Sequence, residues 1–365
     1  MKFTVEKSNI IDEFQALAAV ADKKQTLPIL GNILIRCEAE GVKMLSTDLG
    51  VELEINIQET NIIKPGETTI PAKKAADIIR ELPEGQVSFE LNEESSKLTV
   101  KSSSGRYNLA TIPGSDFPDF DVIKSEVVYP ISTEKLLTLF HKTAFAMANH
   151  DWRHYLNGCF FEKTENSLKM VATDAHRLSI YKTTLDGNGD FSGIIPRKTV
   201  IELMKILPKQ NEEIQFYINA NNIVFMSTKF TFKSKLIENK YPNYNQVVPQ
   251  GEGTKITFNR KKMLDSLSRV SVLTSEKFKA VKLKSEHGVL DISAHNPDQE
   301  SAEEKIDVTG DNAEFYIAFN VNYLREVLST IEDEEISLVS FGSDKSALVQ
   351  SSDQNQVLVV TPLLL

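Results

Sequence analysis

Hydrophobic and polar positions along the chain follow two periodicities that recur in a fixed order. Ile70–Pro83, Ile195–Pro208 and Phe319–Glu332 place apolar residues three and four apart, which predicts amphipathic helices. The first two share an Ile-Pro start, a basic pair and a Leu-Pro end, and the third is a fainter copy. Other stretches, such as Lys229–Ile237, alternate with a period of two, which predicts strands. The chain is therefore predicted to repeat one unit.

A second series of segments supports the repeat. Each member ends a strand, begins a helix with polar residues and continues with apolar pairs at helical spacing. The members are Thr4–Phe14, Pro130–Phe140 and Thr257–Leu267.

A third series contains a Thr-Asp dipeptide. MLSTDLGVEL (Met44–Leu53) matches MVATDAHRLS (Met170–Ser179), and Ser293–Asp298 takes that place in the last copy. Three series with one order and nearly one period predict three similar units, at 1–126, 127–254 and 255–365.

Within each unit the pattern predicts about two helices and many strands. Two apolar runs meet at Glu40-Gly41, which indicates a hairpin. Strands gathered in antiparallel sheets with the helices on one face define the α+β class, which is the predicted fold class.

The composition agrees with a globular protein. The chain has 365 residues, 41% hydrophobic and 25% charged, and no apolar run approaches the ~20 residues that span a bilayer. The charged, amphipathic start MKFTVEKSNIIDEF does not resemble a signal peptide. Cys37 and Cys159 are far apart and have no CxxC or His partner, so we expect a reduced, cytoplasmic protein without a zinc site.

The net charge of −10 argues against non-specific nucleic-acid binding, but it does not reveal how charge is distributed. Basic residues concentrate on the repeated helices and in the loop before Thr26. They are Lys23, Lys24, Lys73, Lys74, Arg80, Arg197, Lys198, Lys205, Arg260, Lys261, Lys262 and Arg269. Either they solvate exposed helix faces, or equivalent helices line one surface that binds the phosphates of a polyanion. Because no arginine cluster with interleaved aromatics occurs, stacking on single strands is less favoured.

Motifs for nucleotide binding, metal-dependent hydrolysis and serine hydrolysis are absent from the sequence. ATDAHRLSIY does place Asp174, His176 and Arg177 together, which raises the alternative of a hydrolase using Asp174 and His176. We expect these two side chains to alternate along a strand end and face opposite ways, which suits a shared acid–base role poorly. A structural turn with one exposed recognition residue fits better, and Arg177 as a purely structural ion-pair bridge remains an alternative.

Several segments together resemble one family along the whole chain, Met1 to Leu365. They are MKFTVEKSNIIDEF, TLPILGNILI, ATDAHRLS, IIPRKTVIELMKIL, YPNYNQVVP, TSEKFKAVKL, NPDQESAEE, FNVNYL and VVTPLLL. They resemble the bacterial DNA polymerase III β subunits, the sliding clamps. The resemblance implies three tandem clamp domains, with two protomers joined head to tail in a six-domain ring whose helices line the hole.

The same resemblance implies the function. Such a ring encircles duplex DNA without reading its sequence and tethers the replicative DNA polymerase as a processivity factor. It has no catalytic activity, cofactor, metal or membrane association, and a clamp-loader ATPase opens it. The alternative is a repeat-built scaffold that binds only proteins, with no DNA encirclement.

In this family, partners carrying a clamp-binding motif insert a short apolar peptide between the second and third domains. The corresponding groove positions are Leu156, Thr173, Ala175, His176, Arg177, Leu178, Pro242, Val247, Asn320, Tyr323, Ser346, Val359, Val360, Thr361, Pro362, Leu363 and Leu364. Ala175 replaces a glycine and disfavours a positive φ, and Gln246 stands where an arginine is common. The tail Thr361–Leu365 lacks the methionines expected on either side of its proline, so partner preference is expected to differ.

Two further sets follow from the resemblance. The DNA-facing residues are Lys24, Lys73, Arg80, His150, Arg153, His154, Arg197 and Lys198, with His150–Arg153 in a loop that projects into the hole. The dimer interface takes Lys74 and Leu109 from one edge and Val272, Leu273, Glu300 and Glu304 from the other. The alternative for Val272 and Leu273 is ordinary helix core.

Overall fold

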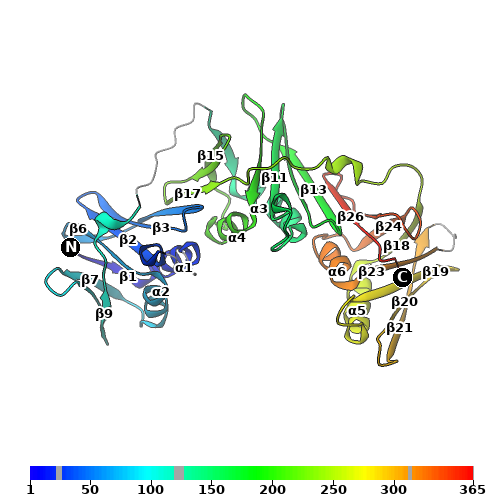
Figure 1. Cartoon of the computed structure of the whole chain (residues 1–365), viewed down its shortest axis with the longest axis horizontal. Coiled ribbons are helices and arrows are strands. Elements are labelled where there is room, and N and C mark those ends of the chain that lie inside the picture. The colour runs from blue at the N-terminus through cyan, green and yellow to red at the C-terminus, as the bar shows by residue number, and fades with distance from the viewer. Residues whose placement is uncertain (22–26, 119–126, 311–314, 365) are drawn as a thin grey trace. The chain divides into compact units, whose positions relative to one another are not determined.

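The computed structural model describes residues 1–21, 27–118, 127–310 and 315–364 (Figure 1). They form two compact units. The first contains Met1–Glu134 with Lys198–Leu236, and the second contains Lys135–Arg197 with Ile237–Leu365. Across the described ranges, no helix combines the length and the apolar character needed to cross a membrane.

The first unit contains two antiparallel sheets. In spatial order the smaller sheet has β5 (Asn61–Lys64), β1 (Lys2–Glu6), β7 (Gln86–Asn92), β8 (Lys97–Lys101) and β9 (Arg106–Ala110). The larger has β10 (Tyr129–Ser132), β15 (Glu213–Ile218), β16 (Asn222–Met226), β17 (Phe230–Lys235), β4 (Val51–Ile57), β3 (Gly41–Thr47), β2 (Asn32–Glu38) and β6 (Gly66–Pro71). Helices α1 (Ile11–Val20) and α2 (Ala72–Glu81) pack against each other and on the sheets. Helix α4 (Arg197–Ile206) lies in this unit from Lys198 onward.

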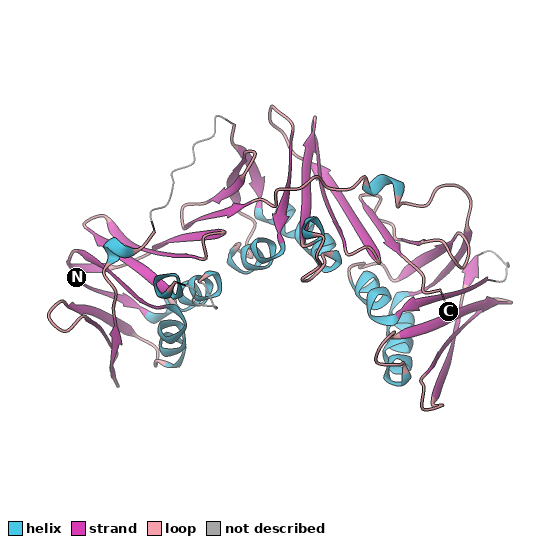
Figure 2. Ribbon diagram, in the orientation of Figure 1, coloured by secondary structure: helices cyan, strands magenta, loops and turns pink. Residues whose placement is uncertain are grey.

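The second unit repeats this plan. Its larger sheet has β14 (Phe191–Pro196), β11 (Gly158–Thr164), β12 (Ser167–Thr173), β13 (Arg177–Thr184), β26 (Gln356–Val360), β25 (Ala347–Gln350), β24 (Glu335–Ser340), β18 (Thr254–Asn259) and β22 (Thr309–Gly310). Its smaller sheet has β21 (Ser301–Asp307), β20 (Val289–His295), β19 (Ala280–Glu286) and β23 (Phe315–Asn320). Helices α5 (Arg260–Val270) and α6 (Val321–Ser329) lie side by side against these sheets (Figure 2). Helix α3 (Thr133–Thr143) enters the unit at Lys135.

The predicted helices and strands are confirmed where the periodicity was clearest. Helix α6 buries Val321, Leu324, Val327 and Leu328, at the three- and four-residue spacing of one helix face. The side chain of Asn320 caps it by accepting hydrogen bonds from the backbone N–H groups of residues 322 and 323, at 3.0 and 3.4 Å. The α+β class with antiparallel sheets is likewise confirmed.

The first repeat departs locally from the other two. A short 3-10 helix, Lys7–Asn9, separates β1 from α1, so the α-helix begins only at Ile11. The Lys7 side chain is buried and donates a 2.6 Å hydrogen bond to the carbonyl of Leu82. A buried ammonium needs such an acceptor, which fixes this segment in a different conformation.

Strand pairing joins successive repeats edge to edge. Strand β4 of the first repeat pairs with β17 of the second, with Leu53 opposite Phe232. Strand β13 of the second repeat pairs with β26 of the third, with Leu178 opposite Val359. In the described strands, the corresponding partners β9 and β21 are left at sheet edges.

Candidate functional site

The Thr-Asp dipeptide of the second repeat forms a hydrogen-bonded turn between β12 and β13. Asp174 Oδ1 accepts hydrogen bonds from the backbone N–H groups of His176 and Arg177, at 2.9 and 3.0 Å. The Thr173 hydroxyl donates to the Arg177 carbonyl at 2.6 Å and accepts from Ala175 N–H at 3.1 Å. The expectation that Asp174 and His176 alternate along a strand is therefore wrong, because the strand ends at Thr173 and backbone amides occupy the carboxylate.

The first repeat contains the same turn. The Thr47 hydroxyl donates to Val51 O at 2.8 Å, and Asp48 Oδ1 accepts from Gly50 and Val51 N–H at 2.9 and 2.7 Å. Leu49 has a φ of 69° and Ala175 a φ of 74°. The turn is therefore shared scaffold, and Ala175 holds a left-handed conformation that an alanine disfavours.

Arg177 occupies the centre of the contacts between this turn and α6. Its guanidinium donates to Asp174 Oδ2 at 3.2 Å, to Glu326 Oε2 at 2.6 Å and to the Phe145 carbonyl at 2.7 Å. It lies over the rings of Phe145 and Tyr323, 5.3 and 4.8 Å from their centroids. The residue is only 7% exposed. Most of its donors are thus committed within the fold, and the structural-bridge alternative describes the observed contacts.

His176 lies exposed above the same helix. Its imidazole stacks on Tyr323, with 5.5 Å between ring centroids and an interplanar angle of 15°. Its carbonyl accepts a 2.8 Å hydrogen bond from Thr361 N–H, which ties the turn to the C-terminal tail. His176 of the second repeat and Tyr323 of the third thus form an aromatic pair, and the His176 backbone binds the tail.

The structure brings most other predicted groove residues to the same β13–β26 junction. Leu178 and Val359 are buried in a cluster with Tyr241 and Tyr244, and Val360 belongs to the core of the third repeat. Leu156 and Pro362 are also buried. Because Tyr241 and Tyr244 pack in the same cluster, Leu178 and Val359 support the junction from beneath and are not an open surface.

The remaining predicted groove residues lie at its margins. Ser346 Oγ lies 3.3 Å from Thr361 Oγ1, and Leu363 N–H donates to the Ala318 carbonyl at 2.7 Å. Asn320 is committed to capping α6. Pro242, Gln246, Val247 and Leu364 are exposed, with Leu364 reaching 80%.

A loop between α3 and β11 carries three residues of the predicted DNA-facing set, His150, Arg153 and His154. Arg153 forms a two-point ion pair with Asp151, with N···O distances of 3.0 and 2.9 Å. These hydrogen bonds, with one from the Arg153 backbone, lower the pKa of Asp151 to about 2. His150 and His154 are exposed, and His150 has a φ of 60°.

The other predicted DNA-facing cations differ in whether their side chains already bind acidic or carbonyl partners within the protein. Lys73 is exposed on α2, whereas Arg80 is paired with Asp77 and Glu81. Lys198 donates to Asp48 Oδ2 at 2.6 Å and to Val20 O at 2.7 Å, so its ammonium is largely engaged. Lys24 lies outside the described residues.

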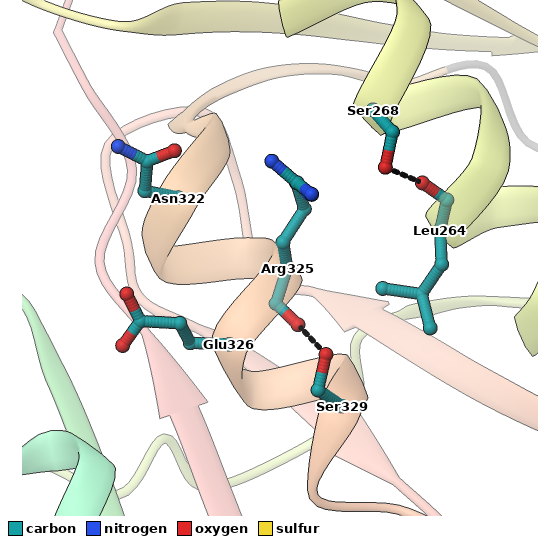
Figure 3. A pocket seen from close by; sticks show the side chains of 6 residues that line it. All are labelled: Leu264, Ser268, Asn322, Arg325, Glu326 and Ser329. Atoms are coloured by element: carbon teal, nitrogen blue, oxygen red, sulfur yellow. Dashed lines mark hydrogen bonds between the residues drawn. The ribbon is translucent and has the colours of Figure 1, made fainter.

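A pocket of about 400 Å³ between α5 and α6 contains a basic residue that the sequence analysis missed (Figure 3). Arg325 extends into it, while the neighbouring Glu326 turns away toward Arg177. No ion pair involves Arg325 in the part of the chain that the structure describes. The available sequence signal was a basic residue one turn after the Asn320 cap, directly following the buried Leu324 and therefore outside the buried positions of α6.

The predicted interface residues lie at the two free sheet edges and on nearby helices. Leu109 is buried on β9, and Lys74 is exposed on α2. Val272 is 78% exposed in the short 3-10 helix Ser271–Leu273, so the helix-core alternative is wrong for it, and Leu273 is half-buried.

The acidic members of that set are held near β21. Arg269 binds Glu304 through two nitrogens, which lowers the pKa of Glu304 to about 2. Glu300 accepts a 2.6 Å hydrogen bond from Asn296.

Groups that commonly carry catalysis have other roles here. Burial raises the pKa of the Cys159 thiol to about 12, which makes it unreactive. Over the described ranges, no three His, Cys, Asp or Glu side chains gather as a metal site.

Three tandem domains of helices packed on antiparallel sheets, joined edge to edge, define a DNA sliding clamp. Family models for the N-terminal, central and C-terminal domains of the DNA polymerase III beta subunit match residues 1–121, 130–243 and 245–363. The chain belongs to the DNA polymerase III beta subunit family.

Known sliding clamps are similar to this chain over its full length. Beta sliding clamps of Pseudomonas aeruginosa and Escherichia coli K12 are each 35% identical, with complete coverage of both chains. A solved P. aeruginosa sliding clamp bound to griselimycin has a TM-score of 0.93 at 34% identity, again with complete coverage of both chains. The Bacillus subtilis clamp has a TM-score of 0.92 at 26% identity, covering 100% of this chain and 99% of that one.

Proposed function

We propose that two copies of this chain join head to tail in a ring that encircles duplex DNA and tethers the replicative polymerase. The observation that carries the proposal is the repeated edge pairing, β4 with β17 and β13 with β26. If the same edge pairing is repeated between two protomers, β21 of one protomer pairs with β9 of its partner. Because each protomer has both edges, two such contacts close the assembly.

Charge supports this pairing. Glu303 lies exposed on β21 and Glu300 on the turn before it, whereas Glu304 is already paired with Arg269 within the protomer. Arg106 lies exposed on β9 and Lys74 on α2. Opposite charges across an interface favour the correct register and association rate. We assign Lys74, Leu109, Val272, Leu273, Glu300 and Glu304 to this interface.

Within the ring, the helices supply the phosphate contacts. Lys73, Arg80, His150, Arg153, His154, Arg197 and Lys198 remain the proposed set, with Lys24 outside the described residues and Arg325 added to it. Lys73 and Arg325 carry the strongest case because acidic partners do not neutralise them in the described structure. Such contacts bind without reading sequence.

Partner peptides are proposed to bind at the β13–β26 junction, over the floor formed by Leu178 and Val359. His176 stacked on Tyr323 forms one wall, and the exposed Val247 and Leu364 lie at the margins. An apolar floor with a few fixed polar groups suits a short apolar peptide. The P. aeruginosa clamp bound to griselimycin is a relative with a ligand, and it motivates a ligand site here.

We propose that the protein acts in the cytoplasm and catalyses no reaction. The proposed domain boundaries lie near residues 126 and 254. A clamp loader and other proteins with clamp-binding motifs complete the partners. The duplex and these peptides are the only ligands that the proposal requires.

Two measurements test the ring. Light scattering after gel filtration should give about twice the protomer mass of 40.9 kDa. Protein loaded onto nicked circular DNA should remain through gel filtration and dissociate when the circle is cut. A monomer at micromolar concentration, or retention that ignores DNA ends, contradicts encirclement and favours the protein-binding scaffold.

A further inference from the structure

Trp152 lies on the loop between α3 and β11 and is 83% exposed. It is the single tryptophan of the chain. A large aromatic ring in water forgoes the favourable burial that tryptophan normally obtains. The exposure therefore needs a cause, and a loosely held loop would be the simplest one.

The loop is instead held firmly on both sides of the ring. Asn157 exchanges two hydrogen bonds with the backbone of Asp151, at 2.9 and 2.7 Å. Asp151 in turn binds the backbone and guanidinium of Arg153, and the Arg153 carbonyl accepts from Leu156 N–H at 2.9 Å. The residues flanking Trp152 are thus fixed, and the fold itself holds the indole in solvent.

The uncompensated charge around the ring is positive, because Arg153 and Asp151 form a neutral pair whereas Arg197 has no acidic partner within the described ranges. Arg153 lies 5.8 Å from the indole centroid, a distance at which a cation interacts with the ring. The nearby carboxylates of Asp151 and Asp174 are already paired with arginines. Arg197 donates to the Met147 carbonyl at the base of the loop, and no ion pair engages it within the described ranges. His150 and His154 add exposed donors.

We propose that Trp152 is a stacking platform for unpaired bases of single-stranded DNA, with Arg153 and Arg197 near the backbone phosphates. This inference rests on the proposed function, because it assigns a ligand to a loop of the DNA-facing set. A fixed flat ring beside cations is what single-strand binding surfaces use, since every base has a π-face. The sequence disfavoured such stacking because it revealed neither the exposure nor the rigidity of Trp152.

The platform distinguishes unpaired bases from two other ligands. Bases inside a duplex are stacked on one another, so the indole reaches only those at a single-stranded stretch. An apolar peptide needs a concave slot, whereas a ring that is 83% exposed offers a flat face.

Fluorescence gives a direct test because the chain contains one tryptophan. The full-length protein is titrated with oligothymidylate, a blunt duplex of equal length, an abasic oligonucleotide and an apolar clamp-binding peptide. We expect oligothymidylate to quench the emission saturably, and the duplex and abasic strand to do so far less. Equal quenching by the abasic strand or the duplex overturns base stacking, and quenching by the peptide alone reassigns Trp152 to partner binding.

Variants measured by anisotropy of a labelled oligothymidylate complete the test. Trp152→Ala should weaken binding by about 5- to 150-fold, whereas Trp152→Phe should retain part of the affinity through its ring. Phe278→Ala, at another exposed aromatic, is the matched control and should change nothing. Unchanged affinity in Trp152→Ala overturns the proposal, and thermal unfolding verifies that the variants are folded.

Loading onto nicked circular DNA separates this inference from the proposed function. If the protein is retained on circular DNA but oligothymidylate does not quench its fluorescence, only the stacking proposal is wrong. If the unmodified protein shows neither retention on circular DNA nor quenching by oligothymidylate, the proposed function is wrong as well.

Discussion

Arg177 Nη1 lies 2.6 Å from Glu326 Oε2, joining the turn of the second repeat to α6 of the third across 149 positions of sequence. The arginine is 7% exposed, while the side chain of the glutamate is half-exposed. Arg177 therefore acts first as a positioning residue, since the same guanidinium also binds Asp174 and the Phe145 carbonyl.

Substitution of Arg177 by alanine should destabilise the fold. It leaves the Phe145 carbonyl and Asp174 without their partner, so the free energy of unfolding should fall by ~2–4 kcal/mol. Glu326→Gln should cost less than ~1 kcal/mol because that partner is half-exposed. Urea unfolding measures both.

Arg80→Ala is the matched control for Arg177→Ala. Arg80 also has two acidic partners, Asp77 and Glu81, but its side chain is 52% exposed. Its loss should therefore lower the free energy of unfolding much less than the loss of Arg177 does. Similar costs at Arg177 and Arg80 would mean that burial does not set the strength of the Arg177 contacts.

His176→Ala should weaken peptide binding without disturbing assembly. The stack on Tyr323 holds the imidazole in place as one wall of the proposed groove. Loss of one such contact with the peptide, worth ~0.5–1.5 kcal/mol, should lower the affinity for a clamp-binding peptide about 2- to 12-fold. Calorimetry measures the affinity, and light scattering should show the same mass as the unmodified protein.

The control for this substitution is His287→Ala, at an exposed histidine beside the β19–β20 hairpin. Peptide affinity should be unaffected there. If His176→Ala binds peptide as well as His287→Ala does, the aromatic pair is not a wall of the groove.

Ala175→Gly should stabilise the protein. The φ of 74° suits glycine better than alanine, and the relief should outweigh the added unfolded-state entropy, giving a gain of ~0.5–1 kcal/mol. Ala172→Gly, in the buried strand just before the turn, should destabilise by a similar amount. Denaturant midpoints that move in the same direction for both would contradict strain at Ala175.

Stability at low pH should depend on Asp151. Its folded pKa of about 2 lies below the unfolded value of about 3.9, so the carboxylate stabilises the fold above pH 4. That contribution is lost as the pH falls through 2. Carboxyl NMR should give a midpoint near 2, and Asp151→Asn should flatten this part of the unfolding profile.

The matched control is Asp186→Asn, on an exposed loop. Its unfolding profile should follow that of the unmodified protein. A midpoint for Asp151 near the ordinary aspartate value would mean that Arg153 does not hold the carboxylate in solution.

Val272→Asp should break the proposed dimer. The Val272 side chain is 78% exposed in the protomer and is proposed to be buried in the dimer interface. Burying an unpaired carboxylate at that position is costly. Light scattering should then give the protomer mass at micromolar concentration. Ile63→Asp, on the β5 edge opposite β9, should leave the dimer intact, and a dimeric Val272→Asp protein would move the interface elsewhere.

The sequence by itself determined the repeated elements, because helix and strand formation depend on local periodicity and on capping residues such as Asn320. It also determined the Thr-Asp turn, whose hydrogen bonds span at most four residues. The family resemblance supplied the site residues, and their roles remain predictions. The two domain boundaries, near residues 126 and 254, remain predictions as well.

Only the tertiary structure decided which of these residues are available to bind. It committed Arg177 and Lys198 to partners about 150 positions away, and it left Arg325 unpaired within the described chain. It also held Trp152 in solvent between two fixed residues. The physical reason is that burial and ion pairing depend on segments that meet only in the folded chain, whereas periodicity is a property of neighbours.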